Sequence, residues 1–287
     1  MELGRRDLVL CSGTLPRDAS FRERVDAARD AGFRGLSMWG RDYASAREEG
    51  HADADIRAML DDAGLAVAEI DPAWWWLPGA AATGAAIPPE HDATDVFRFG
   101  PDELFRIAEV VGARSLNAVD VFGGGWSVDD AAESFADLCD RAAEHGLRLH
   151  VEFLPWSRIP DLATAVAIVT AAGRANGGVM VDSWHFTRSN STLDELRATP
   201  GDLVFGVQLN DGPASPEADL VDATLHARRL PGEGDFDLAG LVGALDGIGA
   251  DAPYGVEVFS DDLAALGPAE AARRAAEATR RVLAGAR

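Results

Sequence analysis

Four oxygen-bearing side chains stand within short apolar runs in the second half of the sequence. They are Glu152 in Val-Glu-Phe, Asp182 in Val-Asp-Ser, Gln208 in Val-Gln-Leu and Glu257 in Val-Glu-Val. A buried carboxylate is costly unless a cation or a hydrogen-bond donor compensates it. A single one more often pairs with a buried arginine, but four at matching depth favour a shared metal ion. We therefore expect one divalent ion here, Mn²⁺ first, with Mg²⁺ or Co²⁺ as alternatives.

The sequence contains no lysine, because all 26 basic residues are arginine. This excludes a lysine Schiff base, lysine-anchored pyridoxal phosphate and a P-loop lysine. Arginine keeps its proton in proteins and cannot act as a base in their place. Proton transfer is therefore left to carboxylates, histidine, tyrosine or water on a metal ion.

Short β-rich runs alternate with amphipathic helical patterns along the whole chain. Strands are predicted at 7–14, 35–39, 66–72, 115–122, 148–154, 178–186, 203–210 and 254–259. Helices are predicted at 20–31, 53–63, 101–112, 128–145, 161–172, 191–198, 237–247 and 268–284. This alternation predicts one (β/α)₈ TIM barrel that occupies residues 1–287 as a single domain.

The carboxyl ends of the barrel strands are where such folds build their active sites. Glu152, Asp182, Gln208 and Glu257 fall at these ends in the last four predicted strands, so we expect them to converge. Two connections at the same end, 73–100 and 211–236, are long enough to shape the site as loops.

The net charge of −22 argues against nucleic acid as a partner, because binding to phosphates needs basic side chains. No apolar run reaches the length of a membrane span, and the N-terminal residues lack a secretory pattern. The two cysteines, Cys11 and Cys139, do not suggest a disulfide framework. We expect a cytoplasmic protein with no membrane partner, and a homodimer as one option for its assembly.

All seven tryptophans lie at or just beyond predicted strand ends, on the side where a ligand would bind. Trp39, Trp74, Trp156 and Trp184 are therefore candidates for an aromatic wall around a carbohydrate-like or partly aromatic substrate. The loop that begins with three tryptophans at 74–76 is a candidate lid. Alternatively, these three anchor the loop or form a subunit contact.

Several segments resemble the xylose isomerase-like barrels, specifically the sugar phosphate isomerase/epimerase family. The segments are VEFLPW, VDSWHF, VQLND, RLPGEGDFDL and GVEVF. The resemblance implies that Glu152 and Glu257 bind the metal and act as the acid and base. It makes Asp182 and Gln208 the other two ligands, although many relatives carry histidine in place of Gln208.

The same resemblance implies that His185 and Arg229 hold substrate oxygens. Their alternatives are a core histidine and a solvent-exposed loop charge. The activity implied is a metal-dependent isomerase or epimerase of a keto sugar or related hydroxy-ketone. The alternative is a lyase, either a dehydratase or an enzyme that opens a keto-glycoside by β-elimination, since both reactions begin with proton removal beside a carbonyl.

Two other functions are disfavoured by the residues present. A type IV apurinic endonuclease needs a histidine-rich zinc site and a basic surface, whereas this chain has six histidines and is acidic. A non-catalytic carbohydrate-binding barrel would be expected to have an incomplete ligand set. Secondary candidates for the pocket are Asp71 and Asp120, with Asp211 as a residue that orients a ligand and His150 as a structural one.

Overall fold

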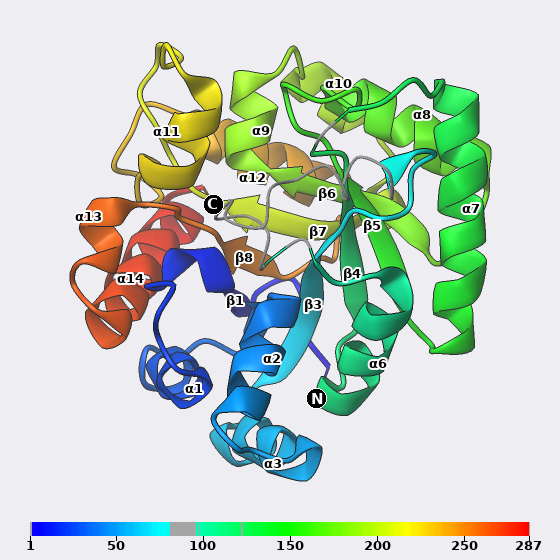
Figure 1. Ribbon diagram of the computed structural model, residues 1–287. Helices are drawn as coiled ribbons and strands as arrows, with labels where there is room; N and C mark the ends of the chain where they lie inside the picture. The colour runs from blue at the N-terminus through cyan, green and yellow to red at the C-terminus, as the bar shows by residue number, and fades with distance from the viewer. Residues whose placement is uncertain (1, 81–95, 97, 122, 287) are drawn as a thin grey trace.

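The computed structural model describes residues 2–80, 96, 98–121 and 123–286, and its strands form one closed barrel (Figure 1). Eight strands follow one another around it in sequence order, and each neighbouring pair is parallel. The strands are β1 (Leu8–Cys11), β2 (Gly35–Met38), β3 (Ala66–Ala73), β4 (Ser115–Val119), β5 (Arg148–Glu152), β6 (Gly177–Asp182), β7 (Val204–Leu209) and β8 (Tyr254–Val256). The predicted (β/α)₈ fold is confirmed.

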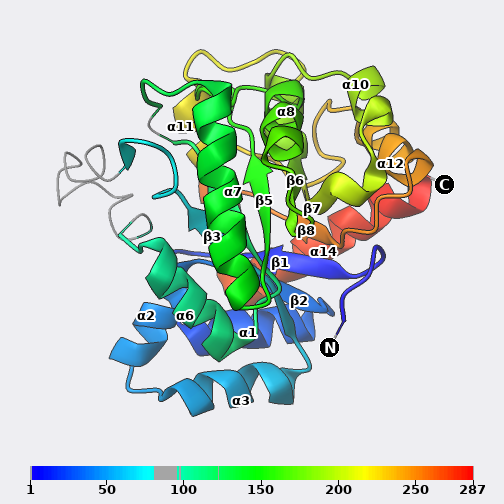
Figure 2. The same cartoon turned by 90° about the vertical axis from the view of Figure 1, so that its right-hand side faces the viewer.

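Helices cover the outside of the barrel, and α7 and α8 pack side by side next to β5 and β6 (Figure 2). The α-helices are α1 (Phe21–Asp30), α2 (Gly40–Glu48), α3 (Asp53–Ala63), α6 (Pro101–Val111), α7 (Val128–Glu144), α8 (Leu162–Ala172), α9 (Ser183–Arg188), α10 (Leu193–Ala198), α11 (Leu220–His226), α12 (Leu238–Gly247), α13 (Asp261–Ala264) and α14 (Pro268–Gly285). Two 3₁₀ turns, η1 (Ser12–Thr14) and η2 (Gly201–Leu203), complete the assignment. Among these described residues, no helix is both long and apolar enough to cross a membrane.

The strand predicted at 178–186 is wrong beyond Asp182, because residues 183–188 form helix α9. Asp182 causes this change, since its side chain accepts hydrogen bonds from the backbone N–H groups of Trp184 and His185. It thereby satisfies donors that a helix leaves free at its start. The prediction also missed α2, which directly follows β2, and extended the first and last strands too far.

Side chains alternate along each strand between the helix-facing core and the barrel interior. In β5, Leu149 and Val151 belong to the main hydrophobic core. His150, between them, has its Nε2 3.1 Å from Glu69 Oε2 of β3, across the barrel interior. The interior of this barrel is therefore polar, and it carries buried groups from several strands toward the carboxyl end.

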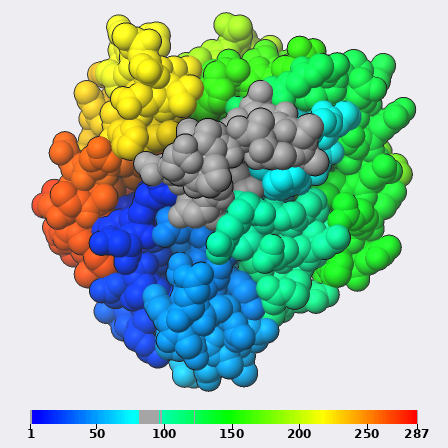
Figure 3. All heavy atoms as spheres, in the orientation of Figure 1, coloured from blue at the N-terminus to red at the C-terminus, as the bar shows by residue number. Residues whose placement is uncertain are grey.

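The segment 211–236 after β7 is organised by the carboxylate of Asp211. Its two oxygens accept from the backbone N–H groups of Gly212, Gly232 and Phe236, at 2.8–3.0 Å. Gly232 has a φ of +83°, a conformation that favours glycine. Figure 3 shows the yellow part of this segment beside the orange residues near α13, to which it is joined by a bridge between Ala227 and Ser260. Asp211 therefore shapes the loop, and its role in orienting a ligand stays a prediction.

Candidate active site and metal centre

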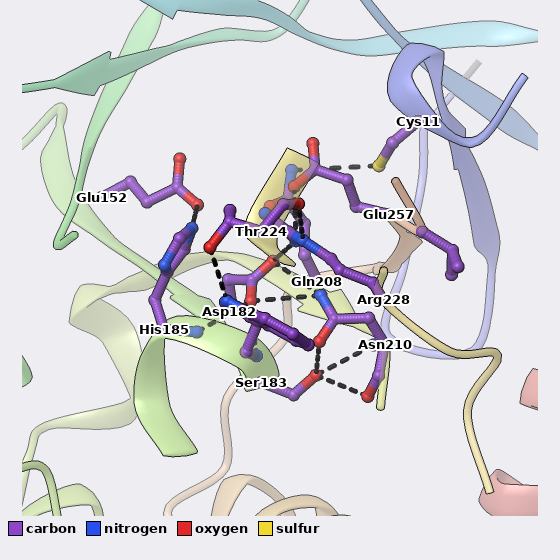
Figure 4. A network of polar contacts seen from close by, with 12 residues as sticks. Cys11, Glu152, Asp182, Ser183, His185, Gln208, Asn210, Thr224, Arg228 and Glu257 are labelled. Carbon is purple, nitrogen blue, oxygen red and sulfur yellow. Dashed lines mark hydrogen bonds and ion pairs between the residues drawn. The ribbon is translucent and has the colours of Figure 1, made fainter. Parts of the chain in front are cut away.

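The four predicted ligands lie at the carboxyl ends of β5 to β8 and are all buried. Glu152 and Asp182 are the last residues of their strands, Gln208 is the penultimate one, and Glu257 follows β8. Asp182 and Gln208 are partners in the β6–β7 register. Figure 4 shows Asp182 and Gln208 between Glu152 on one side and Glu257 on the other.

Three of these residues bring oxygen atoms unusually close together. The Gln208 amide oxygen position lies 3.2 Å from Asp182 Oδ2 and 3.3 Å from Glu257 Oε2. In this orientation its Nε2 donates to Glu69 Oε1 at 3.3 Å. With the amide turned over, the nitrogen would donate to both carboxylates instead. Only the orientation that places the amide oxygen there gives the spacing of roughly 3 Å expected between two oxygen ligands of one octahedral ion.

His185 extends this set of possible ligands. Glu152, Asp182 and His185 each offer one ligand atom, and these atoms lie within 4.8 Å of one another. His185 Nε2 is 3.6 Å from Glu152 Oε1, and its Nδ1 has no hydrogen-bond partner among the described residues. Burial lowers the pKa of His185 to about 3. The imidazole is thus neutral at physiological pH, as a metal ligand must be.

Arg228 is the arginine that faces the site, although the sequence analysis selected Arg229. Arg228 Nη1 donates to Asp182 Oδ2 at 3.0 Å and to Glu257 Oε2 at 3.1 Å, with its side chain buried. Arg229 is exposed, and its backbone pairs with Asp211 in an antiparallel bridge. Because consecutive side chains of an extended segment point in opposite directions, only one of the two arginines can point inward. Arg228 is therefore the arginine that contacts the proposed ligands, and the substrate role predicted for Arg229 stays a prediction.

Burial also governs the protonation of the two glutamates. The pKa of Glu152 is raised well above its ordinary value, first by burial and then by the charge of Glu257. The pKa of Glu257 is likewise raised by burial, and Arg228 opposes this increase. Burial thus favours the neutral form of both carboxyl groups in the metal-free protein.

Two amides hold the carboxylates in place, and the sequence analysis named neither. Asn117 of β4 donates from Nδ2 to Glu152 Oε2 at 2.6 Å and to Asp71 Oδ1 at 3.0 Å. Asn210 donates to both oxygens of Asp182, at 3.0 and 3.2 Å. Asn117 stands in an apolar strand like the four ligands, so the same signal could have identified it. Asp120 accepts only backbone N–H groups, from Gly123 and Arg158, and belongs to a loop.

The tryptophans divide between the site and the packed interior. Trp156 is partly exposed, and its ring meets that of His185 edge-on, with centroids 5.5 Å apart. Trp39 is stacked on Phe259, and Trp74 packs in a small cluster with Val119 and Leu154. Trp184 is fully buried and donates to Thr224, so it has no surface for a substrate and is not retained as a candidate.

The lid prediction cannot be followed along the whole loop. Residues 81–95 and 97, which make up most of it, lie outside the described residues. Within the described part, Trp76 packs against Phe135 and donates to the carbonyl oxygen of Val119. This residue anchors the start of the loop, in agreement with the alternative role considered for the three tryptophans.

The family model described as the xylose isomerase-like TIM barrel matches residues 25–282. The chain belongs to this family. This match establishes the family, and the candidate metal centre rests on the geometry of this chain.

Curated relatives of this xylose isomerase-like chain carry the names of enzymes. The 3-dehydroshikimate dehydratase of Pseudomonas aeruginosa is 28% identical over 259 residues, which are 88% of this chain and 37% of that protein. An inosose isomerase of Bacillus velezensis is 31% identical over 155 residues, or 53% of this chain and 54% of that protein. The chain therefore spans about a third to a half of the length of these relatives.

Solved structures agree with the barrel over nearly its whole length. A crystal structure of IOLI protein with a binding zinc atom has a TM-score of 0.82 at 18% identity, and covers 98% of this chain and 99% of its own. D-allulose 3-epimerase from Methylomonas sp. has a TM-score of 0.71 at 16% identity, with 98% and 99% covered. At such low identity the likeness establishes the fold alone.

Proposed function

We propose that this chain is a divalent-metal-dependent isomerase or epimerase of a keto sugar or related hydroxy-ketone. The observation that supports it best is the position of two buried glutamates with raised pKa values, Glu152 and Glu257, on opposite sides of Asp182 and Gln208 (Figure 4). Two such groups can remove a proton from one face of a carbon and return one to the other face or to the neighbouring carbon.

Glu152, Asp182, Gln208 and Glu257 would hold the ion, with His185 as a further donor. A bound divalent ion would polarise a carbonyl and an adjacent hydroxyl, and so acidify the carbon beside them. Carboxylate and amide oxygens suit Mn²⁺ first, with Mg²⁺ or Co²⁺ as alternatives. Arg228 supplies a fixed positive charge to Asp182 and Glu257, and His185 can hold a substrate oxygen.

The substrate would be a small carbohydrate-like or partly aromatic molecule. Trp156, next to His185, offers a ring face on which a sugar or a cyclic apolar group can stack. We propose that the segment 211–236, which carries Arg228, closes one side of this space.

A dehydratase is the second candidate, because two relatives with that name align with most of this chain. Two proteins named 3-dehydroshikimate dehydratase match 88% of this chain, the inosose isomerases match 50–53% of it, and a putative hydroxypyruvate isomerase of Streptomyces coelicolor matches 84%. Elimination would begin with the same proton removal by a glutamate. The carbon–oxygen bond of a β-hydroxyl would then break, and the hydroxyl would leave as water after receiving a proton.

Proton NMR in D₂O, with the Mn²⁺-loaded protein and a panel of cyclic and open-chain hydroxy-ketones, tests both candidates. An isomerase or epimerase would give a product of unchanged formula that carries deuterium at the reacting carbon. A dehydratase would give a new carbon–carbon double bond. If no compound shows exchange or turnover, or if Glu152→Gln and Glu257→Gln leave the exchange unchanged, the proposal is wrong.

A further inference from the structure

A second cavity lies at the opposite end of the barrel, away from the candidate metal centre. It has a volume of about 300 Å³ and is bordered by residues at the amino ends of β3, β4, β5, β7 and β8. The charged residues that border it are Glu69, Arg114, Arg148, Asp202 and Asp251, of which Glu69 already contacts Gln208 and His150 inside the barrel. Active sites of such barrels lie at the carboxyl end, so this cavity is not explained by the proposed function.

Two arginines enter this cavity from adjacent strands. The backbone N–H of Arg148 donates to the carbonyl oxygen of Arg114 at 3.1 Å, so the two side chains start from neighbouring positions. Arg148 lies over the ring of Phe205, with its guanidinium carbon 3.5 Å from the ring centre. Arg114 donates from Nη1 to the carbonyl oxygen of Leu3. Both side chains are thus held in place and partly buried.

These two guanidinium groups have no carboxylate within 4.0 Å among the described residues. Burial and the charge of Arg114 both lower the pKa of Arg148, and Asp251 opposes them only from a distance. The exposed carboxylates of Asp202 and Asp251 at the rim likewise form no ion pair with any described residue. Unpaired charges of both signs therefore border one cavity.

We propose that this cavity binds a small zwitterion of the amino-acid type. Its carboxylate would lie between Arg114 and Arg148, which together present several N–H donors to one anion. Its ammonium group would face Asp202 and Asp251 at the rim. Phe205, Ala252 and Pro253 supply apolar surface for a short side chain. A ligand with both charges could pair with the arginines and with the aspartates, whereas a simple anion or a simple cation could pair with only one of these two sets.

The test is binding of L-alanine, L-serine and L-glutamine to the full-length, metal-loaded protein, followed through the Nε–H signals of ¹⁵N-labelled arginine. Acetate and ethylammonium serve as half-ligands. We expect an amino acid to shift the signals of Arg114 and Arg148 and to bind at least tenfold more tightly than either half-ligand. Arg148→Gln and Asp251→Asn should each weaken binding by about tenfold, the loss expected from one charged partner.

Arg197→Gln and Asp194→Asn are matched controls, since they make the same charge changes in an exposed pair that does not line the cavity. Both should bind as the wild type does. The proposal is overturned if acetate binds as tightly as the amino acids, if the cavity variants bind normally, or if no compound shifts the two signals. None of these outcomes depends on the reaction at the metal centre.

Discussion

The Nη1 nitrogen of Arg228 donates to Asp182 Oδ2 at 3.0 Å, inside the barrel mouth. The same nitrogen lies 3.1 Å from Glu257 Oε2, so one guanidinium nitrogen contacts two carboxyl groups. Breaking a buried ion pair by removing one partner is strongly destabilising, because the remaining charge has no compensation. Arg228 is therefore expected to matter to the fold as well as to the site.

Arg228→Gln should lower the free energy of unfolding of the metal-free protein by roughly 3–5 kcal/mol. The loss should be smaller with Mn²⁺, because a bound cation would also neutralise Asp182 and Glu257. Arg229→Gln is the matched control and should change stability by less than about 0.5 kcal/mol, as an exposed residue does. Urea unfolding with and without metal measures both. An equal effect of the two variants would show that the inward arginine has been wrongly assigned.

Removal of the metal should abolish turnover, and one equivalent of Mn²⁺ should restore it. Glu152→Gln and Glu257→Gln should each lower kcat by about 10²–10⁴-fold, the usual contribution of a positioned acid or base. Glu133→Gln is the matched control, since it makes the same change on the exposed face of α7, outside the site, and should not lower kcat. Steady-state kinetics and elemental analysis give the two readouts. Full activity after exhaustive chelation would contradict the metal mechanism.

Asn117 should act as a positioning residue for Glu152. Its Nδ2 donates to Glu152 and to Asp71, so Asn117→Ala leaves two buried carboxylates without their shared donor. We expect kcat to fall by about 10–100-fold, as for other residues that orient a metal ligand. The pH profile of kcat should also shift, because a donor to Glu152 Oε2 lowers the pKa of that carboxyl. A purely structural role would lower the melting temperature and leave the pH profile unchanged.

The barrel could be predicted from the sequence because each strand is a short apolar run between glycine-bounded helices. The four ligand positions were identifiable for the same reason, since a carboxylate or amide within such a run is conspicuous. Glu152 and Asp182 indeed end β5 and β6. Asn117 meets the same criterion, but the prediction named Asp120, later in the same segment, instead.

Other parts of the site depend on three-dimensional contacts that sequence patterns do not encode. Choosing between Arg228 and Arg229 requires the bridge between Asp211 and Arg229, which decides the side that each arginine faces. Trp184 looked like a pocket residue because it follows Asp182, yet the cap formed by Asp182 starts a helix that turns this ring into the interior. Both errors arise from hydrogen bonds that the sequence pattern does not reveal. One set forms the bridge between Asp211 and Arg229, and the other forms the cap at Asp182.

Metal binding should release protons and become tighter as the pH rises. The raised pKa values of Glu152 and Glu257 mean that the metal-free site holds protons that a cation must displace. Calorimetry in buffers of different ionisation enthalpy should show more protons released at about pH 6 than at about pH 8. In Glu257→Gln the release should diminish, because one of the two protonated groups is gone. Affinity that is independent of pH would contradict the raised pKa values.

Asp71 should make the metal-free protein less stable as the pH rises. Burial and then the charge of Glu69 raise its pKa to about 7 from an ordinary value of 3.8. Between these two values the unfolded chain loses the proton while the folded one keeps it, so rising pH favours unfolding across this window. Glu152 and Glu257 act in the same direction and His185 in the opposite one, and the difference between wild type and Asp71→Asn reports Asp71 together with its effect on the two glutamates.

The Asp71→Asn variant keeps an amide oxygen that can accept from Asn117 Nδ2, but it cannot ionise. Its stability relative to the wild type should therefore increase from about pH 4 to pH 7 and stay constant above that range. Asp194→Asn, at an exposed position, should give a difference that does not vary with pH over the same range. Chemical denaturation at several pH values measures both curves. A flat difference for Asp71→Asn would mean that this carboxyl ionises normally inside the barrel.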